Sequence, residues 1–262
     1  MVLPSEVPMK RFACLLAVVL AILVFRQRAF GQRPPDGGTR DVLISILIPS
    51  ITDAPFTATV NTEWIRSLDD GSTITLVNHR AIARDKAGRI FQERRLLLPD
   101  DPNQHSIVTQ IEISDPVAHE LYICVPSGHT CQVEVLQAPE GKRFSRALPA
   151  IQPGTPGVED LGMQTTAGLQ AIGRRESSII PEGAIGNNRP LTASFEYWYS
   201  PQLGVNLISK RRDPRFGLQN FQLSDVILKD PDPALFQPPP GFRLTDLREV
   251  PQTTTSAATP KN

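Results

Sequence analysis

The chain has 262 residues, and its 27 basic and 27 acidic side chains give a formal net charge of zero at pH 7. This balance provides no general attraction to nucleic acid or to an anionic membrane surface, so the sequence predicts neither as a partner. Hydrophobic residues make up 40% of the chain, which is enough for a globular core, while 25 prolines disfavour long helices.

The first 31 residues have the organisation of a secretory signal peptide. Lys10 and Arg11 precede an uninterrupted apolar run over residues 12–25, and Ala29-Phe30-Gly31 follows as a small-residue cleavage site. A cationic start, a short apolar run and such a site define a signal peptide, and the run is shorter than the roughly 20 residues that span a bilayer. We therefore expect a signal over residues 1–31, with Met9 as an alternative start, and a periplasmic or secreted protein.

Two arginines leave a second interpretation of the N-terminus open. Arg26 and Arg28 lie between the apolar run and the cleavage site, which would suit an uncleaved N-terminal anchor. Membrane contact is expected only through such an anchor. Cys14 is not preceded by the small and aliphatic residues of a lipobox, so lipidation there is not expected. Cleavage after Gly31 would remove four basic residues and one acidic residue, leaving a slightly acidic mature chain.

Residues 32–54 are expected to join the signal to the folded part of the chain. The segment begins with a Gly-, Pro- and Arg-rich stretch that predicts flexibility. The apolar run over residues 42–48 is too short to span a membrane. It predicts a strand or short helix that docks on the core.

From Phe56 to residue 135 the sequence has a period of two, which predicts six strands. On the first strand, Phe56, Ala58, Val60 and Trp64 fall on one face and the polar residues between them fall on the other. Turn sequences at 69–71, 85–88 and 115–118 separate successive strands. The pattern indicates an antiparallel meander with one buried face and one solvated face.

The last of these turns leads into two strands that each carry a cysteine. Pro126-Ser127-Gly128-His129 forms the turn between them, and a hairpin centred there places Cys124 directly opposite Cys131. Facing positions bring the two Cα atoms within disulfide range, so we predict a structural disulfide. A metal site formed by the two cysteines with His129, and a redox-active cysteine pair, are the alternatives.

The second half of the chain predicts further strands after a Pro- and Gly-rich insert at residues 138–157. One of these strands, over residues 192–199, is rich in aromatic residues and places Phe195, Tyr197 and Tyr199 on one face. Residues 55–250 are therefore expected to form a single mainly β domain of about ten strands, with residues 251–262 as a disordered tail. A closed barrel, a two-sheet sandwich or a strongly curved sheet with a cover would each bury the apolar face.

No pattern of catalytic or metal-binding residues stands out. The chain lacks the nucleophile, phosphate-loop, dinucleotide and zinc motifs, and its four histidines are scattered over turns and strands. The acidic pairs Asp100-Asp101 and Asp230 with Asp232 are interpreted as turn formers, with a catalytic or calcium-binding role as the alternative. The side chains of Lys210-Arg211-Arg212 alternate between the faces of a strand; a solvated face is favoured, with anion binding as the alternative. We expect no catalytic residue, no metal and no cofactor. A hydrolase whose site the sequence does not advertise is the remaining enzyme alternative.

Three C-terminal segments resemble the LolA-like superfamily, exported bacterial proteins that include periplasmic lipoprotein carriers and stress-sensing relatives. These segments are an aromatic strand, turn and strand over residues 195–205, a strand over 221–226, and a Pro-Gly stretch over 233–242 that leads to the last strand. The resemblance implies an incomplete, strongly curved antiparallel barrel. It also implies a short helical lid that closes the barrel over an apolar cavity.

The sequence and the resemblance together predict a non-enzymatic exported binding module with an apolar pocket. The pocket would take a lipid, an acyl chain or a hydrophobic segment of a partner protein, and its lining candidates are Trp64, Phe195, Tyr197 and Tyr199. Tyr and Trp suit such a lining because they combine an apolar body with a polar tip. The alternative is a structural or envelope-interaction β protein whose core is filled by its own side chains.

Overall fold

The period of two in the sequence becomes one large β-sheet. The computed structural model describes residues 43, 45–137 and 157–248; the predicted signal, most of the insert and the predicted tail lie outside them. The described residues form thirteen strands of this sheet. They are β1 (Phe56–Ser67), β2 (Thr73–Arg84), β3 (Ile90–Arg95), β4 (Leu98–Pro99), β5 (Val108–Asp115), β6 (Glu120–Val125), β7 (Thr130–Val135), β8 (Val158–Thr166), β9 (Leu169–Ile180), β10 (Leu191–Ser200), β11 (Val205–Asp213), β12 (Gly217–Ile227) and β13 (Arg243–Asp246).

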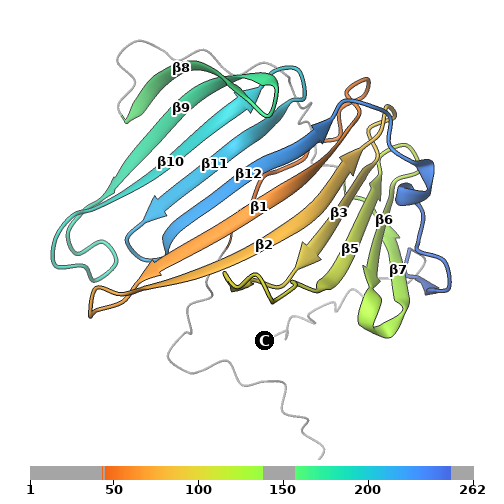
Figure 1. The fold of residues 1–262 in the computed structure, drawn as a ribbon, viewed down its shortest axis with the longest axis horizontal. Helices are drawn as coiled ribbons and strands as arrows, with labels where there is room; N and C mark the ends of the chain where they lie inside the picture. The colour runs from red at the N-terminus through yellow and green to blue at the C-terminus, as the bar shows by residue number, and fades with distance from the viewer. Residues whose placement is uncertain (1–42, 44, 138–156, 249–262) are drawn as a thin grey trace, which may run out of the picture. The chain divides into compact units, whose positions relative to one another are not determined.

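The strands follow one another in the order β13, β7, β6, β5, β3, β2, β1, β12, β11, β10, β9 and β8, with β4 paired to β2. All neighbours are antiparallel except β13, which runs parallel to β7. Figure 1 shows the sheet bending between its broad part, β8 to β2, and the shorter strands β3 to β7. Its two ends, β8 and β13, do not pair with each other, so the sheet is curved and open.

The strand count differs from the expected ten. β13, of four residues, lies where the resemblance implied a last strand, whereas no sequence pattern predicts β4, which has two residues. Strands this short show little of a period of two, and β13 pairs with β7, which lies far away in the sequence. Their pairing is therefore not visible in local sequence patterns.

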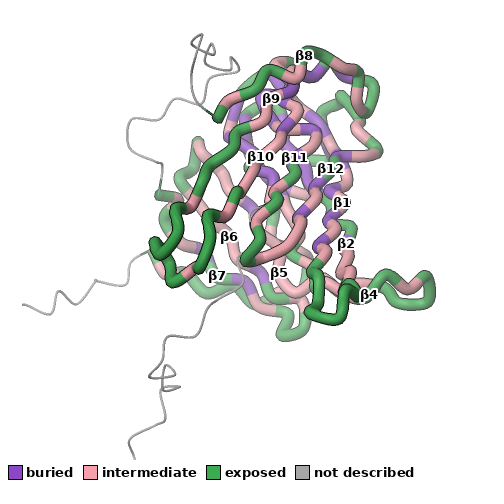
Figure 2. Tube along the Cα trace, turned by 90° about the vertical axis from the view of Figure 1, so that its left-hand side faces the viewer, coloured by how far each residue is buried: buried purple, intermediate pink, exposed green. Residues whose placement is uncertain are grey.

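The larger hydrophobic core lies on one face of the broad part of the sheet. Phe56, Ala58 and Val60 of β1 are buried there, as the alternation predicted, together with apolar residues of β2, β11 and β12. Residues 45–55 adopt no helix or strand, but Ile46 and Ile48 are 4% and 7% exposed and belong to this core. Figure 2 shows buried positions alternating with half-buried ones along these strands.

A second, smaller core lies on the opposite face. Ala83, Phe91 and Ile113 occupy facing positions on β2, β3 and β5, and Ala83 points away from the face that buries its neighbour Ile82. The 3-10 turn η2 (Pro233–Phe236) covers this patch with Phe236, which is 4% exposed.

The expected short helical lid over the apolar face is therefore not found among the described residues. The Pro-Gly segment that the resemblance assigned to the end of the fold does contain a helical turn, but this turn belongs to η2 and packs on the other side of the sheet. Ala83, Phe91 and Ile113 form an apolar patch on this side. Phe236 is removed from water by packing on the patch, and this burial fixes the position of η2.

A fully buried arginine connects three distant segments. Arg84, at the end of β2, is 0% exposed and donates hydrogen bonds to the carbonyl oxygens of Pro49, Ala54 and Leu203 at distances of 2.5–3.0 Å. Its guanidinium carbon also lies 5.1 Å from the ring centroid of Phe56. Since buried charge is stable only when it is well hydrogen-bonded, this cluster fixes the segment before β1 against the turn between β10 and β11.

The predicted disulfide is confirmed. Cys124 on β6 faces Cys131 on β7, the two are disulfide-bonded, and both are fully buried. The intervening turn is η1 (Pro126–Gly128), followed by His129 in the left-handed region with φ of 47°. No helix in the described part of the chain is long and apolar enough to cross a membrane.

Candidate functional site

The structure places two of the four predicted lining residues in one row across the sheet. Phe195 on β10 pairs with Arg211 on β11, Arg211 with Gln219 on β12, and Gln219 with Trp64 on β1. Cross-strand partners point to the same face of a sheet. We call the side of the sheet that carries this row the aromatic face. The larger core lies on the same side.

Tyr197 lies on the same face in the adjacent row, and its ring centroid is 5.0 Å from that of Phe195. Its hydroxyl donates a 3.0 Å hydrogen bond to Oε1 of Glu176, the residue that faces Phe195 from β9. Burial and this hydrogen bond both raise the pKa of Tyr197. Tyr199 lies beyond a β-bulge, where the register between β10 and β11 shifts.

The aromatic side chains differ in how much surface they leave free. Trp64, Tyr197 and Tyr199 are 7%, 7% and 8% exposed, whereas Phe195 is half-buried. The indole Nε1 of Trp64 donates a 2.7 Å hydrogen bond to the carbonyl oxygen of Phe216, which fixes the ring orientation. Phe195 therefore offers the most accessible ring of the four.

Arg211 is one of the charged groups of the aromatic face, together with Glu176 and Arg174 on β9. Its guanidinium carbon lies 4.2 Å from the centroid of Phe195, a cation–π distance. Its Nε is buried and has no hydrogen-bond partner among the described residues. Desolvation lowers the pKa of Arg211, and only the negative charge of Glu176 opposes this effect. The aromatic row thus contains a cation with an unused donor.

The opposite face carries a row of polar residues. Glu159, Arg175, Glu196, Lys210, Asn220 and Glu63 face one another in this order across β8, β9, β10, β11, β12 and β1. We call this set the polar row. Arg175 lies 2.7 Å from Glu159 and 2.8 Å from Glu196, and Lys210 lies 3.5 Å from Glu196. Opposite charges in directly facing positions stabilise a sheet by roughly 0.2–1 kcal/mol per pair.

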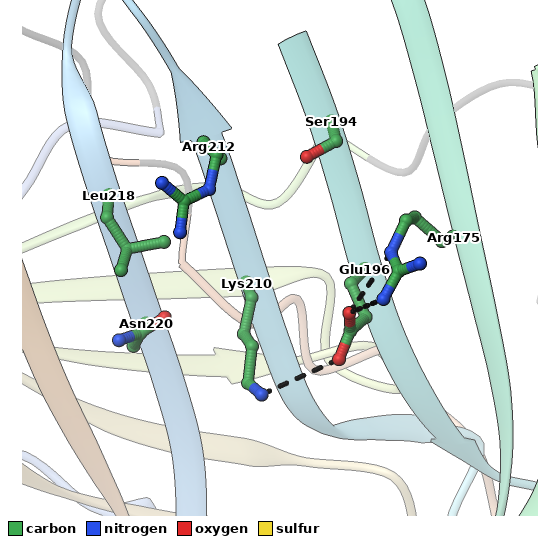
Figure 3. A pocket seen from close by; sticks show the side chains of 7 residues that line it. All are labelled: Arg175, Ser194, Glu196, Lys210, Arg212, Leu218 and Asn220. Carbon is green, nitrogen blue, oxygen red and sulfur yellow. Dashed lines mark hydrogen bonds and ion pairs between the residues drawn. The ribbon is translucent and has the colours of Figure 1, made fainter.

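A hollow of about 420 Å³ lies above the middle of this row (Figure 3). Its polar lining comes from four adjacent strands: Arg175, Ser194, Glu196, Lys210, Arg212 and Asn220. We call it the polar hollow. Alternation along β11 explains its composition, because Lys210 and Arg212 point into the hollow while Arg211 between them points to the aromatic face.

Glu196 is the central carboxylate of the hollow. Partial burial would raise its pKa, but hydrogen bonds from Arg175 and Trp198 and the charge of Lys210 hold the pKa below its ordinary value. The pKa of Arg175 is raised, chiefly by its hydrogen bond to Glu196. Both groups are therefore ionised at neutral pH.

Sequence reasoning did not identify the polar row or the hollow. Its residues are spread from position 63 to position 220, and only the strand register brings them together. The available signal was the alternation of Lys210-Arg211-Arg212, which separates the cations between two faces. The alternation predicts which face each cation occupies, but it does not predict the partners on neighbouring strands.

The other polar residues considered for chemistry lie in local structural contacts. Asp232 caps η2 by accepting from the backbone N–H of Ala234, and Asp101 accepts from the N–H of Asn103. His79 Nδ1 lies 2.6 Å from Oδ1 of Asn61 on the neighbouring strand. Within the described ranges, no group of three or more His, Cys, Asp or Glu side chains is arranged to hold a metal ion.

Comparisons with known proteins return only structural similarity. No protein-family model matches the sequence, and no curated protein matches it. An uncharacterized conserved protein from Thermus thermophilus matches with 9% identity over 74% of this chain and 90% of its own, at a TM-score of 0.39. A chain of the Pseudomonas aeruginosa MucA/MucB complex matches with 15% identity over 74% of this chain, at a TM-score of 0.37. The match spans only 58% of that chain.

A LolA superfamily protein from Nitrosomonas europaea is also among the similar structures. It matches with 12% identity over 71% of this chain and 91% of its own, at a TM-score of 0.27. Identities and TM-scores this low carry no conclusion about ligand or activity.

Proposed function

We propose that this protein is a non-enzymatic exported binding module that holds an amphiphile, an acyl chain with an acidic end, on its aromatic face. The observation that carries the proposal is Arg211, which lies against the ring of Phe195 with a buried Nε that no described residue accepts from. A carboxylate or phosphate would accept from this donor. The half-buried ring of Phe195 supplies apolar surface beside it.

The energetics favour a ligand that has both an apolar chain and an acidic end. Each Å² of apolar ligand surface that leaves water contributes about 25 cal/mol. A hydrogen bond between ionised partners adds about 1.5–3 kcal/mol, and more specificity than the apolar contact gives. An acyl chain without an acidic end would leave the Arg211 donor unused.

The proposed location is the periplasm or the extracellular space. A buried disulfide between Cys124 and Cys131 supports it, because such bonds persist in oxidising compartments. N-terminal sequencing of the protein from an expressing bacterium tests the signal. A first residue of Gln32 supports release, whereas an intact N-terminus in the membrane fraction supports the anchor.

A structural protein with a filled core is the second candidate. The burial of Trp64, Tyr197 and Tyr199 favours it, because little of their surface is free for a ligand. The two functions differ in one measurable respect. A binding module accommodates a ligand next to Trp64 and Phe195, whereas a structural protein with a filled core has no room for one there.

Fluorescence quenching by a brominated fatty acid distinguishes them. The chain has two tryptophans, so the Trp198→Phe variant leaves Trp64 as the only tryptophan, whose fluorescence can be excited selectively over that of tyrosine. We expect saturable quenching by a brominated acid and none by the unbrominated acid. Arg211→Gln should weaken the binding, while Arg212→Gln, which changes the neighbouring residue on the opposite face, should not. Absence of quenching, together with no lipid in native mass spectra of the purified protein, would overturn the proposal.

A further inference from the structure

We infer that the polar hollow on the opposite face is a second binding site, for a small molecule that carries an oxyanion and a hydroxyl group. The oxyanion would be a phosphate or carboxylate. This site shares no residue with the aromatic face and does not depend on the function proposed for it. The inference rests on three side chains of the hollow whose hydrogen-bonding or charge capacity the described residues leave unused.

Arg212 is the cation of the hollow that no carboxylate in the described part of the chain balances, because Arg175 is paired with Glu159 as well as with Glu196. Arg175, Lys210 and Arg212 line it, and Glu196 is the only acidic side chain among the lining residues. Glu196 is already shared between Arg175 and Lys210. Arg212 is exposed and has no ion-pair or hydrogen-bond partner in the described part of the chain. Its guanidinium is free to take an oxyanion in a two-point contact.

Ser194 lies next to Arg212 and adds a second hydrogen-bond donor for an anion. It faces Arg212 directly across β10 and β11, and its hydroxyl has no partner among the residues that the structure describes. Lys210 lies two residues before Arg212 on the same face of β11. Figure 3 shows these three side chains around the same space, which gives an oxyanion donors from two adjacent strands.

Asn220 is the reason why the ligand should also carry a hydroxyl group. Its Nδ2 donates a 2.7 Å hydrogen bond to Oε2 of Glu63. Because an ionised carboxylate only accepts, this contact fixes the amide orientation and leaves Oδ1 as the other end. That Oδ1 is buried and has no hydrogen-bond partner within the described residues. A ligand that donates to Oδ1 of Asn220 and offers an oxyanion to Arg212 would satisfy both ends of the hollow.

The size and openness of the hollow set the kind of ligand. A volume of about 420 Å³ is in the usual range for small-molecule pockets. Lys210 and Arg175 are 48% and 39% exposed, so their charges are screened by solvent and salt. Binding should therefore weaken strongly as the ionic strength rises.

Calorimetric titration with inorganic phosphate, glycerol and glycerol 3-phosphate tests the inference. Glycerol 3-phosphate should bind more tightly than inorganic phosphate, and glycerol alone should not bind. Arg212→Gln should weaken glycerol 3-phosphate at least about tenfold, the effect of losing one charge-assisted hydrogen bond. The control Arg243→Gln, which changes an exposed arginine of the terminal strand β13, should leave it unchanged. Asn220→Ala should remove the advantage over inorganic phosphate.

Vesicles of phosphatidylglycerol distinguish two sources of the same chemistry. Binding to vesicles that is lost in Arg212→Gln assigns the hollow to a lipid headgroup, and binding to glycerol 3-phosphate alone assigns it to a free molecule. No binding to any of the probes overturns the inference, as does equal binding by folded Arg212→Gln protein. Neither result affects the quenching experiment, because that experiment reports on Arg211 and Trp64.

Discussion

The indole ring of Trp198 packs directly on the backbone of Gly173, its cross-strand neighbour on β9. A Cβ at position 173 would lie 2.5 Å from Cζ3 of the ring, closer than real side chains approach. The same indole donates from Nε1 to Oε1 of Glu196 at 3.3 Å. Because Gly173 has no side chain, the ring of Trp198 can lie against its backbone. In this position the ring donates a hydrogen bond to Glu196, the central carboxylate of the polar hollow.

The substitution Gly173→Ala should destabilise the protein by about 1–3 kcal/mol, because the ring of Trp198 must move to admit the methyl group. Urea unfolding monitored by circular dichroism measures the change. Gly128→Ala is the matched control, since the nearest atom to a Cβ there is Oγ1 of Thr130 at 3.5 Å. Equal stability of the two variants would contradict the contact.

Replacing the fully buried Arg84 should be more costly. Arg84→Met removes hydrogen bonds to three carbonyl oxygens and leaves them buried without these donors. A loss of roughly 3 kcal/mol or more is expected from such a change. Thermal unfolding measures it, with the exposed Arg189→Met as a control that should stay within about 0.5 kcal/mol of the wild type. A wild-type melting temperature for Arg84→Met would show that the cluster contributes little.

The disulfide should stabilise the fold by a modest amount. Closing the short loop between Cys124 and Cys131 is worth about 2.5 kcal/mol on the chain-entropy account. The double variant Cys124→Ala with Cys131→Ala should lose that amount in denaturant unfolding. Adding a reductant should lower the stability of the wild type and leave the double variant unchanged. A reductant effect of equal size on both proteins would show that it acts elsewhere.

Tyr122 should give the protein an alkaline stability limit. Its hydroxyl donates a 2.6 Å hydrogen bond to Oε2 of Glu120, and this contact, together with desolvation, raises the pKa of Tyr122 to about 12. The folded state therefore keeps the proton that the unfolded chain loses near pH 10. The stabilising contribution is complete below about pH 10 and disappears as the pH rises through 12.

Tyrosinate absorbance tests this assignment. The difference between the titrations of wild type and Tyr122→Phe should have its midpoint near pH 12. Glu120→Gln, which replaces the charged acceptor, should move the midpoint towards 10, the ordinary value for tyrosine. A midpoint near 10 in the wild-type difference would refute the hydrogen bond.

The sequence predicted what is encoded in short-range periodicity. The alternation on β1 assigned Phe56, Ala58 and Val60 to the buried face, and the hairpin around Pro126 placed Cys124 opposite Cys131. Both predictions depend on residues within a few positions of each other. The open, curved, mainly antiparallel sheet also agrees with the LolA-like resemblance.

Features that depend on long-range register were not predictable in this way. The four residues of β13 pair with β7, more than a hundred positions earlier, and Phe236 packs on a patch formed by strands β2, β3 and β5. The polar row requires the register of six strands at once. The resemblance implied a helical lid over the apolar cavity. The helical turn η2 instead packs on the patch formed by β2, β3 and β5.

The terminal strand β8 also has a consequence for how the protein behaves in concentrated solution. A sheet that does not close on itself leaves backbone donors and acceptors available for recruiting another chain, the first step of aggregation. On β8 the register shifts between Asp160 and Gly162, Gly162 has a φ of +77°, and Oδ1 of Asp160 accepts from the N–H of Gly162. This bulge interrupts the straight template, and the exposed charges of Glu159 and Asp160 repel an identical strand. We expect this irregularity to disfavour edge-to-edge association through the described part of β8.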